Sequence, residues 1–254
     1  MSGLTVVVHR DATVLAEAVA ARLLTRLVDA QAQRGRASVV LTGGGIGIAS
    51  LEAVRRAPAR AAVDWRRVDV WWGDERFVPA DSEERNDVQA RRALLDSLDL
   101  DPARVHPMGA LGGPDGDEAD AAAQRYADEL LAAAADDHEV PLFDVLLLGM
   151  GPEGHIASIF PESPAAYDER TVIGVHGCPK PPPTRITLGF PAIREAREVW
   201  VIAAGAEKAT AAAMALGGAG QVQVPAAGGR GRSQTLWLLD EPAASTLPRG
   251  LRRL

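Results

Sequence analysis

Short apolar runs alternate along the chain with longer, Ala-rich stretches that have an amphipathic pattern. Runs of the first kind predict strands, and the longer periodic stretches predict helices. The expected strands cover residues 4–9, 38–42, 68–73, 143–148, 185–188, 198–203 and 234–239. The expected helices cover residues 13–32, 46–57, 86–98, 118–135 and 206–216. Strands that alternate with helices predict an α/β fold with a mostly parallel sheet covered on both sides.

The run 143–148 is the most apolar of these strands, so we expect it in the centre of the sheet, buried on both faces. Loops are expected at 74–85, which is polar, and at 109–116, which is rich in Gly, Pro and Asp. The Gly-rich, basic segment 217–232 is too short to link two domains. We therefore expect a single domain over residues 1–254.

The composition, with 47% hydrophobic and 24% charged residues, is typical of a globular protein with a substantial core. The net charge of −7 argues against broad binding to nucleic acid or anionic membranes, although a few arginines can still attract an anionic substrate. Cys178 is the only cysteine, which excludes an intrachain disulfide and suits a reducing compartment. Since we see no secretory signal and no apolar run of about 20 residues, we expect a cytoplasmic protein.

Three unusual loops follow expected strands, at 42–47, 73–79 and 149–161. Open parallel sheets bind their ligands at the carboxyl edge, where such loops lie. In the first loop, Thr42 precedes the run Gly43-Gly44-Gly45, and a helix follows. Glycines let backbone N–H groups approach an oxyanion, and Thr42 can donate its hydroxyl, so we interpret this loop as an anion site. The alternative is a tight turn, for which one glycine would suffice.

The second loop places Asp74, Glu75 and Arg76 directly after an apolar strand. Charged residues are badly placed there for burial unless they have partners or a function. Asp74 could orient a neighbouring group, and Arg76 could bind an oxyanion through its planar guanidinium. A solvated turn with a local ion pair explains the same residues equally well.

The third loop carries His155 after three glycines that match G-x-G-x-x-G, the nominal signature of a dinucleotide site. We reject that interpretation because Glu153 would repel a pyrophosphate and because two nearby prolines leave too little room for a long helix. The match also falls in the middle of the chain rather than in its first strand–helix unit. His155 is instead a candidate general base, since the pKa of an imidazole suits proton transfer near neutrality.

Arg185, which opens an expected strand after three prolines, and Lys208, near the start of the helix 206–216, could add positive charge. A lysine at a helix N-terminus opposes the helix dipole, so it favours a bound anion; the alternative is a solvated lysine. The sequence has no G-x-S-x-G elbow for a serine hydrolase. Its five histidines show no metal-ligand spacing, so we expect a site without a metal or cofactor.

These segments occur in the same order in 6-phosphogluconolactonases, which the chain resembles over essentially its whole length. The matching segments are Thr42-Gly-Gly-Gly, Trp72-Gly-Asp-Glu-Arg-Phe-Val-Pro, Gly149-Met-Gly-Pro-Glu-Gly-His-Ile-Ala-Ser-Ile-Phe-Pro, Arg185-Ile-Thr-Leu and Gly205-Ala-Glu-Lys-Ala. The resemblance implies the three-layer α/β sandwich shared with glucosamine-6-phosphate deaminases and ribose-5-phosphate isomerases. Two positions depart from the family pattern: Gly45 lacks the hydroxyl that is common there, and Glu153 replaces a frequent Asp.

The resemblance also implies hydrolysis of 6-phosphoglucono-δ-lactone to 6-phosphogluconate, in the oxidative pentose phosphate pathway, by direct attack of water. His155 would act as the general base and Arg76 would stabilise the oxyanion. Asp74 and Glu153 would orient these two groups, and which carboxylate serves which group stays open. The implied phosphate-binding residues are Thr42, Gly43, Gly44, Arg185 and Lys208. The partner would be a small-molecule substrate, with no cofactor; the sequence leaves the oligomeric state open.

Three other functions remain open at this point. An aminosugar-phosphate deaminase or isomerase shares the implied fold, but its charged loop resembles Asp-Glu-Tyr rather than Asp74-Glu75-Arg76. A sugar-phosphate sensor would bind without turnover, and such modules usually carry a basic recognition helix that this sequence lacks. An oxidoreductase would be stabilised thermally by NAD(P).

Overall fold

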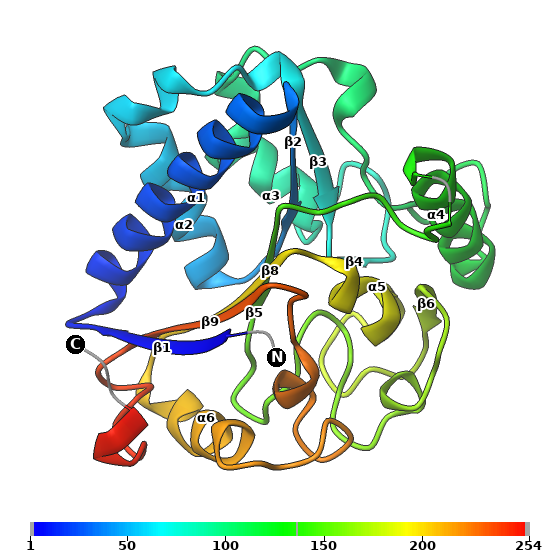
Figure 1. Ribbon diagram of the computed structural model, residues 1–254. Coiled ribbons are helices and arrows are strands. Elements are labelled where there is room, and N and C mark those ends of the chain that lie inside the picture. The colour runs from blue at the N-terminus through cyan, green and yellow to red at the C-terminus, as the bar shows by residue number, and fades with distance from the viewer. Residues whose placement is uncertain (1–2, 136, 252–254) are drawn as a thin grey trace.

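The computed structural model describes residues 3–135 and 137–251 and contains a central sheet of six parallel strands (Figure 1). In spatial order the strands are β1 (Gly3–His9), β9 (Gln234–Asp240), β8 (Glu198–Ala203), β5 (Val145–Gly149), β2 (Ala37–Leu41) and β3 (Val68–Trp72). All five pairings between neighbours are parallel. The predicted parallel sheet is confirmed, and β5 lies inside it with its four apolar residues buried, as expected.

Three helices cover one face of this sheet: α1 (Ala12–Arg34), α2 (Gly45–Arg56) and α3 (Asn86–Ala93). The expected end of the third helix, at residue 98, is wrong. Leu94 leaves the helical conformation, with φ −145° and ψ −56°, and a 3₁₀ turn at Leu95–Ser97 follows. Leu94 and Leu95 are both buried in the apolar cluster under these helices, so packing has overridden the helical pattern.

The other face is covered by α4 (Ala119–Ala133), α5 (Phe190–Glu195), α6 (Ala209–Leu216) and a small antiparallel sheet. The small sheet has the order β4-β7-β6, with β4 at Asp74–Arg76, β7 at Arg185–Leu188 and β6 at Val172–Val175. In Figure 1, α1 and α2 lie on one side of the central sheet and α6 lies on the other. This arrangement is the expected three-layer sandwich.

The prediction of a polar loop at 74–85 is wrong for its first three residues, because Asp74–Arg76 forms strand β4. The central residue, Glu75, is fully buried, and its carboxylate accepts backbone N–H groups of Arg76, Asn86 and Asp87 at 2.7–2.9 Å. The buried Arg85 guanidinium lies 3.7 Å from the same carboxylate. Burial raises the pKa of Glu75 to about 7, against the effect of Arg85 and the N–H donors. These partners explain how a charged segment forms a buried strand.

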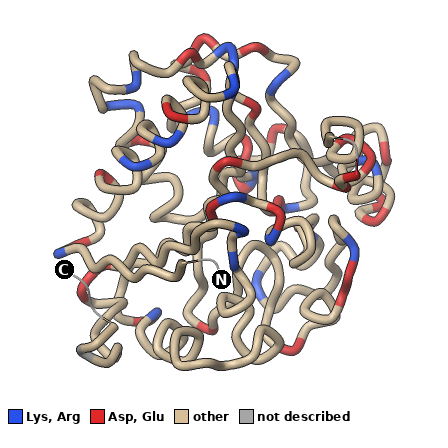
Figure 2. The backbone as a smooth tube through the Cα atoms, viewed as in Figure 1, with Lys and Arg blue, Asp and Glu red and all other residues tan. Residues whose placement is uncertain are grey.

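Charged residues of both signs are interspersed over the helices and loops, whereas the central strands are largely free of them (Figure 2). Across the described residues, no helix combines the length and the apolarity that crossing a membrane requires. The chain runs from β2 outward to β3 and later returns to β5, which lies on the other side of β2. Such a reversal of strand order is where open α/β sheets bind their ligands.

Candidate active site

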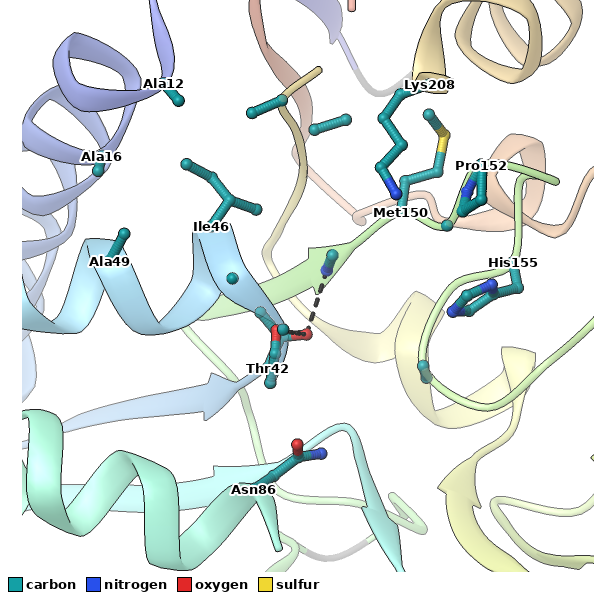
Figure 3. A pocket seen from close by; sticks show the side chains of 18 of the residues that line it. Ala12, Ala16, Thr42, Ile46, Ala49, Asn86, Met150, Pro152, His155 and Lys208 are labelled. Atoms are coloured by element: carbon teal, nitrogen blue, oxygen red, sulfur yellow. Dashed lines mark hydrogen bonds between the residues drawn. The ribbon is translucent and has the colours of Figure 1, made fainter. Parts of the chain in front are cut away.

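A cavity of about 610 Å³ opens at the carboxyl ends of β2, β5 and β8. Eight of the nine predicted site residues line it: Thr42, Gly43, Gly44, Asp74, Arg76, His155, Arg185 and Lys208. Figure 3 shows Thr42, His155 and Lys208 around the same space, each from a different segment of the chain. The ninth residue, Glu153, is not part of the lining and contacts His155, with Glu153 Oε1 3.0 Å from His155 Nδ1.

The glycine loop forms one wall of the cavity and leads into α2. Gly44 caps this helix with a φ of 81°, a conformation that glycine adopts without strain. At Gly43 a Cβ atom would overlap the side-chain amide of Asn86, so a larger residue there would have to displace that amide. The Thr42 hydroxyl oxygen accepts the Gly149 N–H at 3.1 Å, which ties the end of β2 to the end of β5. The first N–H groups of α2 lack helical partners, and these groups can bind an oxyanion.

The charged strand β4 supplies Asp74 and Arg76, and Asn86 connects the two. The Asn86 Nδ2 donates to the Asp74 backbone oxygen at 2.8 Å and to its carboxylate at 3.3 Å, and Asn86 Oδ1 accepts from Arg76 Nη1. Arg76 Nη1 also donates to the Glu84 backbone oxygen, and Ser158 Oγ donates to the Asp74 carboxylate at 2.7 Å. Any orienting effect of Asp74 on Arg76 therefore passes through Asn86.

The His155 loop follows β5, and its side chain is 17% exposed. The imidazole stacks on Phe160, with 4.5 Å between ring centroids, and a Cβ at Gly151 would overlap the ring. Burial lowers the pKa of His155, although the neighbouring Glu153 carboxylate opposes this effect. A neutral imidazole in a cavity can accept a proton near pH 7. Within this described segment, residues 150–163 form no helix, in keeping with our rejection of a dinucleotide site.

Lys208 and Arg185 reach the cavity in different ways. Lys208 ends a 3₁₀ turn at Ala206–Lys208, directly before α6, and burial lowers the pKa of its ammonium. Arg185 lies in β7 and is buried; its Nε and Nη2 donate to backbone carbonyls of residues 180–182 at 3.1–3.2 Å. Its guanidinium also lies 5.8 Å from the Phe160 ring centroid. Two of the three Arg185 nitrogens thus hold protein backbone, and the third, Nη1, has no hydrogen-bond partner among the described residues.

Sequence reasoning missed further polar residues that line the cavity: Thr13, Glu52, Arg56, Asn86, Lys180 and Glu207. Asn86 is the first residue of α3 and gave no local signal. Lys180 stands between Pro179 and Pro181, and a lone lysine in a proline-rich segment is the local signal for it. Its ammonium donates to Glu153 Oε2 at 2.9 Å. Among residues 3–135 and 137–251, no cluster of three His, Cys, Asp or Glu side chains could hold a metal ion.

The fold and the cavity define an α/β enzyme whose site combines an imidazole, guanidinium and ammonium groups, and a glycine loop at a helix N-terminus. Comparison with known proteins gives the family. The chain belongs to the glucosamine-6-phosphate isomerase/6-phosphogluconolactonase family, whose model matches residues 10–237.

Individual relatives agree with this assignment. A 6-phosphogluconolactonase of Streptomyces coelicolor is 62% identical over 248 residues, which cover 96% of this chain and 95% of the relative. The solved 6-phosphogluconolactonase of Trypanosoma brucei is similar with a TM-score of 0.82 and 29% identity, over 98% of this chain and all of that one. A monomeric glucosamine-6-phosphate deaminase, 18% identical with a TM-score of 0.76, covers 95% of this chain and 99% of its own; it shares the fold. The prediction that this chain shares its fold with glucosamine-6-phosphate deaminases is thereby confirmed.

Proposed function

We propose that this protein hydrolyses 6-phosphoglucono-δ-lactone to 6-phosphogluconate, a step of the oxidative pentose phosphate pathway. The observation that carries this proposal is the meeting of His155, Arg76 and Lys208 around one cavity, in a chain that matches lactonases over almost its full length. A general base, an oxyanion donor and a phosphate-binding cation are the three groups that such a reaction needs. The lone, buried Cys178 also suits the cytoplasmic location that we propose.

In the first step, His155 takes a proton from water as the water oxygen attacks the lactone carbonyl carbon. Its lowered pKa leaves the imidazole neutral, and so able to accept that proton, at physiological pH. The carbonyl oxygen becomes an oxyanion, which the Arg76 guanidinium stabilises by an effect worth about 3 kcal/mol for one good donor. The bond from the carbonyl carbon to the ring oxygen then breaks, and the ring oxygen receives the proton from His155. The product is an open chain with a carboxylic acid, which releases its proton to the solvent and becomes a carboxylate.

The distant phosphate would hold the lactone in place. The N–H groups at the start of α2, next to Thr42, Gly43 and Gly44, face the cavity with the partial positive charge of a helix N-terminus. Lys208 adds an ammonium from the turn between β8 and α6, and Arg185 adds a guanidinium from β7. Glu153 would orient His155, whereas Asp74 would act on Arg76 through Asn86.

A proton-release assay with freshly made lactone tests the function, after the spontaneous rate has been subtracted. We expect turnover by the wild-type protein well above that rate and no release of ammonia from glucosamine 6-phosphate. Ammonia release without lactone turnover would assign the chain to the deaminase branch of its family. A folded protein that binds 6-phosphogluconate but turns over neither substrate would be a sensor.

A further inference from the structure

Lys180 and Arg56 are the two lining cations to which the proposed mechanism gives no task, and of these Lys180 contacts the partner of His155. Lys180 precedes β7, lines the cavity, and its side chain is 40% exposed. Its backbone segment is fixed, because Arg185 donates to the carbonyl oxygens of Lys180, Pro181 and Pro182 at 3.1–3.2 Å. The Lys180 ammonium is therefore held near one target, the Glu153 carboxylate, at 2.9 Å.

The Glu153 carboxylate has two competing neighbours. Lys180 donates to it directly, whereas His155 Nδ1 lies 3.0 Å from Oε1 but outside hydrogen-bond geometry. His155 Nδ1 is in fact buried without a hydrogen-bond partner among the described residues. A carboxylate that is fully engaged with an imidazole would favour the charged, protonated ring. Here the better-formed interaction is with the ammonium.

We propose that Lys180 is a positioning residue: its ammonium competes with His155 for the Glu153 carboxylate and so sets the pH above which His155 can accept a proton from water. The inference rests on the proposed function for its effect on turnover. The proton affinity of His155 can, however, be measured on the free protein, without substrate.

Some groups around His155 raise its pKa and others lower it. Burial has the largest effect and lowers the pKa of His155; Glu153 raises it, Lys180 lowers it, and Asp74 in β4 raises it. The other charged groups that share the cavity with His155 are Arg76 in β4, Arg185 in β7, Glu52 and Arg56 in α2, Glu207 and Lys208. Lys180 therefore lowers the pKa of His155 in two ways, through its own charge and by occupying Glu153.

The test is an NMR titration of the His155 imidazole in the wild-type protein and in Lys180→Met, with the resonance assigned by its loss in His155→Gln. Without the ammonium, Glu153 is free to pair with the imidazole, so the pKa of His155 should rise by about 1 unit. The acid limb of kcat/KM for the lactone should move by the same amount. Lys180→Arg, which keeps the positive charge, should keep both the pKa of His155 and the acid limb close to their wild-type values. Lys208→Met removes another ammonium of the cavity and should leave the pKa of His155 near its wild-type value.

An unchanged or lower His155 pKa in folded Lys180→Met would overturn the inference. A higher KM with an unmoved pKa would also overturn it, and would make Lys180 a substrate ligand instead. Should Lys180→Met fail to fold, Lys180→Gln provides the same comparison with a neutral polar side chain. If the wild-type protein shows no lactone turnover, the proposed function fails, while the titration still decides the role of Lys180.

Discussion

The central sheet brings mainly loops and backbone to the cavity, whereas the small sheet brings charged side chains that lie within its strands. The glycine loop and the His155 loop follow β2 and β5, and their glycines make room for Asn86 and for the imidazole. Asp74, Arg76 and Arg185 instead belong to β4 and β7, which pair with each other in antiparallel register. The two halves of the site therefore depend on different interactions: close packing around His155, and buried polar networks around Arg76.

The largest effect is expected for His155, at the end of the central sheet. Replacing His155 by Gln removes the proposed base, and kcat should fall by about 10²- to 10⁴-fold with little change in KM. Steady-state kinetics with fresh lactone measures both. His138→Gln, at a half-exposed histidine outside the cavity, serves as the matched control and should behave like the wild-type protein. Near-normal turnover by folded His155→Gln would show that His155 is not the general base.

Arg76 provides the corresponding test of the small sheet. Arg76→Met should lower kcat by about 10²- to 10³-fold, because a preorganised oxyanion donor is lost. Arg66→Met is the control, since Arg66 is exposed and its ion pair with Asp99 lies at the surface. If Arg76→Met raised KM and left kcat unchanged, the guanidinium would bind the ground state instead, and its assignment to the oxyanion would be wrong.

The stability of the small sheet should depend on the buried carboxylate of Glu75. Glu75→Ala leaves three backbone N–H groups and the Arg85 guanidinium without this acceptor, and should lower the free energy of unfolding by about 3 kcal/mol. Urea denaturation measures the change. Glu83→Ala, whose ion pair with Arg92 is exposed, should cost less than about 0.5 kcal/mol. An equal loss of unfolding free energy in Glu75→Ala and Glu83→Ala would show that the buried Glu75 carboxylate is no more important to stability than an exposed one.

The smallest effect is expected for phosphate binding by Lys208, in the turn between β8 and α6. Lys208→Met should raise KM for the phosphorylated lactone by about tenfold or more, with a smaller change in kcat, because one charge-assisted contact is lost. The unphosphorylated glucono-δ-lactone is the control substrate. On it, the wild-type protein and Lys208→Met should be equally slow. A similar KM ratio on both lactones would place Lys208 away from the phosphate.

The same contrast explains what the sequence could predict. All six strands of the central sheet follow from local apolar runs, and β5 is the plainest case. By contrast, β4 consists of Asp74, Glu75 and Arg76, and their burial depends on Arg85, Asn86 and Ser158, which lie 9 to 84 positions away. No local pattern reveals such partners. Lys180 has a local signal in its proline-rich segment, but its contact with Glu153 spans 27 positions and no local pattern reveals it.

Convergence of the two sheets on one carbonyl group is the central claim, and a double-mutant cycle tests it most directly. The cycle compares kcat/KM of the wild-type protein, His155→Gln, Arg76→Met and the double variant. Residues that act together in one transition state are strongly non-additive, so the double variant should lose little more than the more damaging single variant. If the two losses multiply in full, His155 and Arg76 act independently, and the account is contradicted.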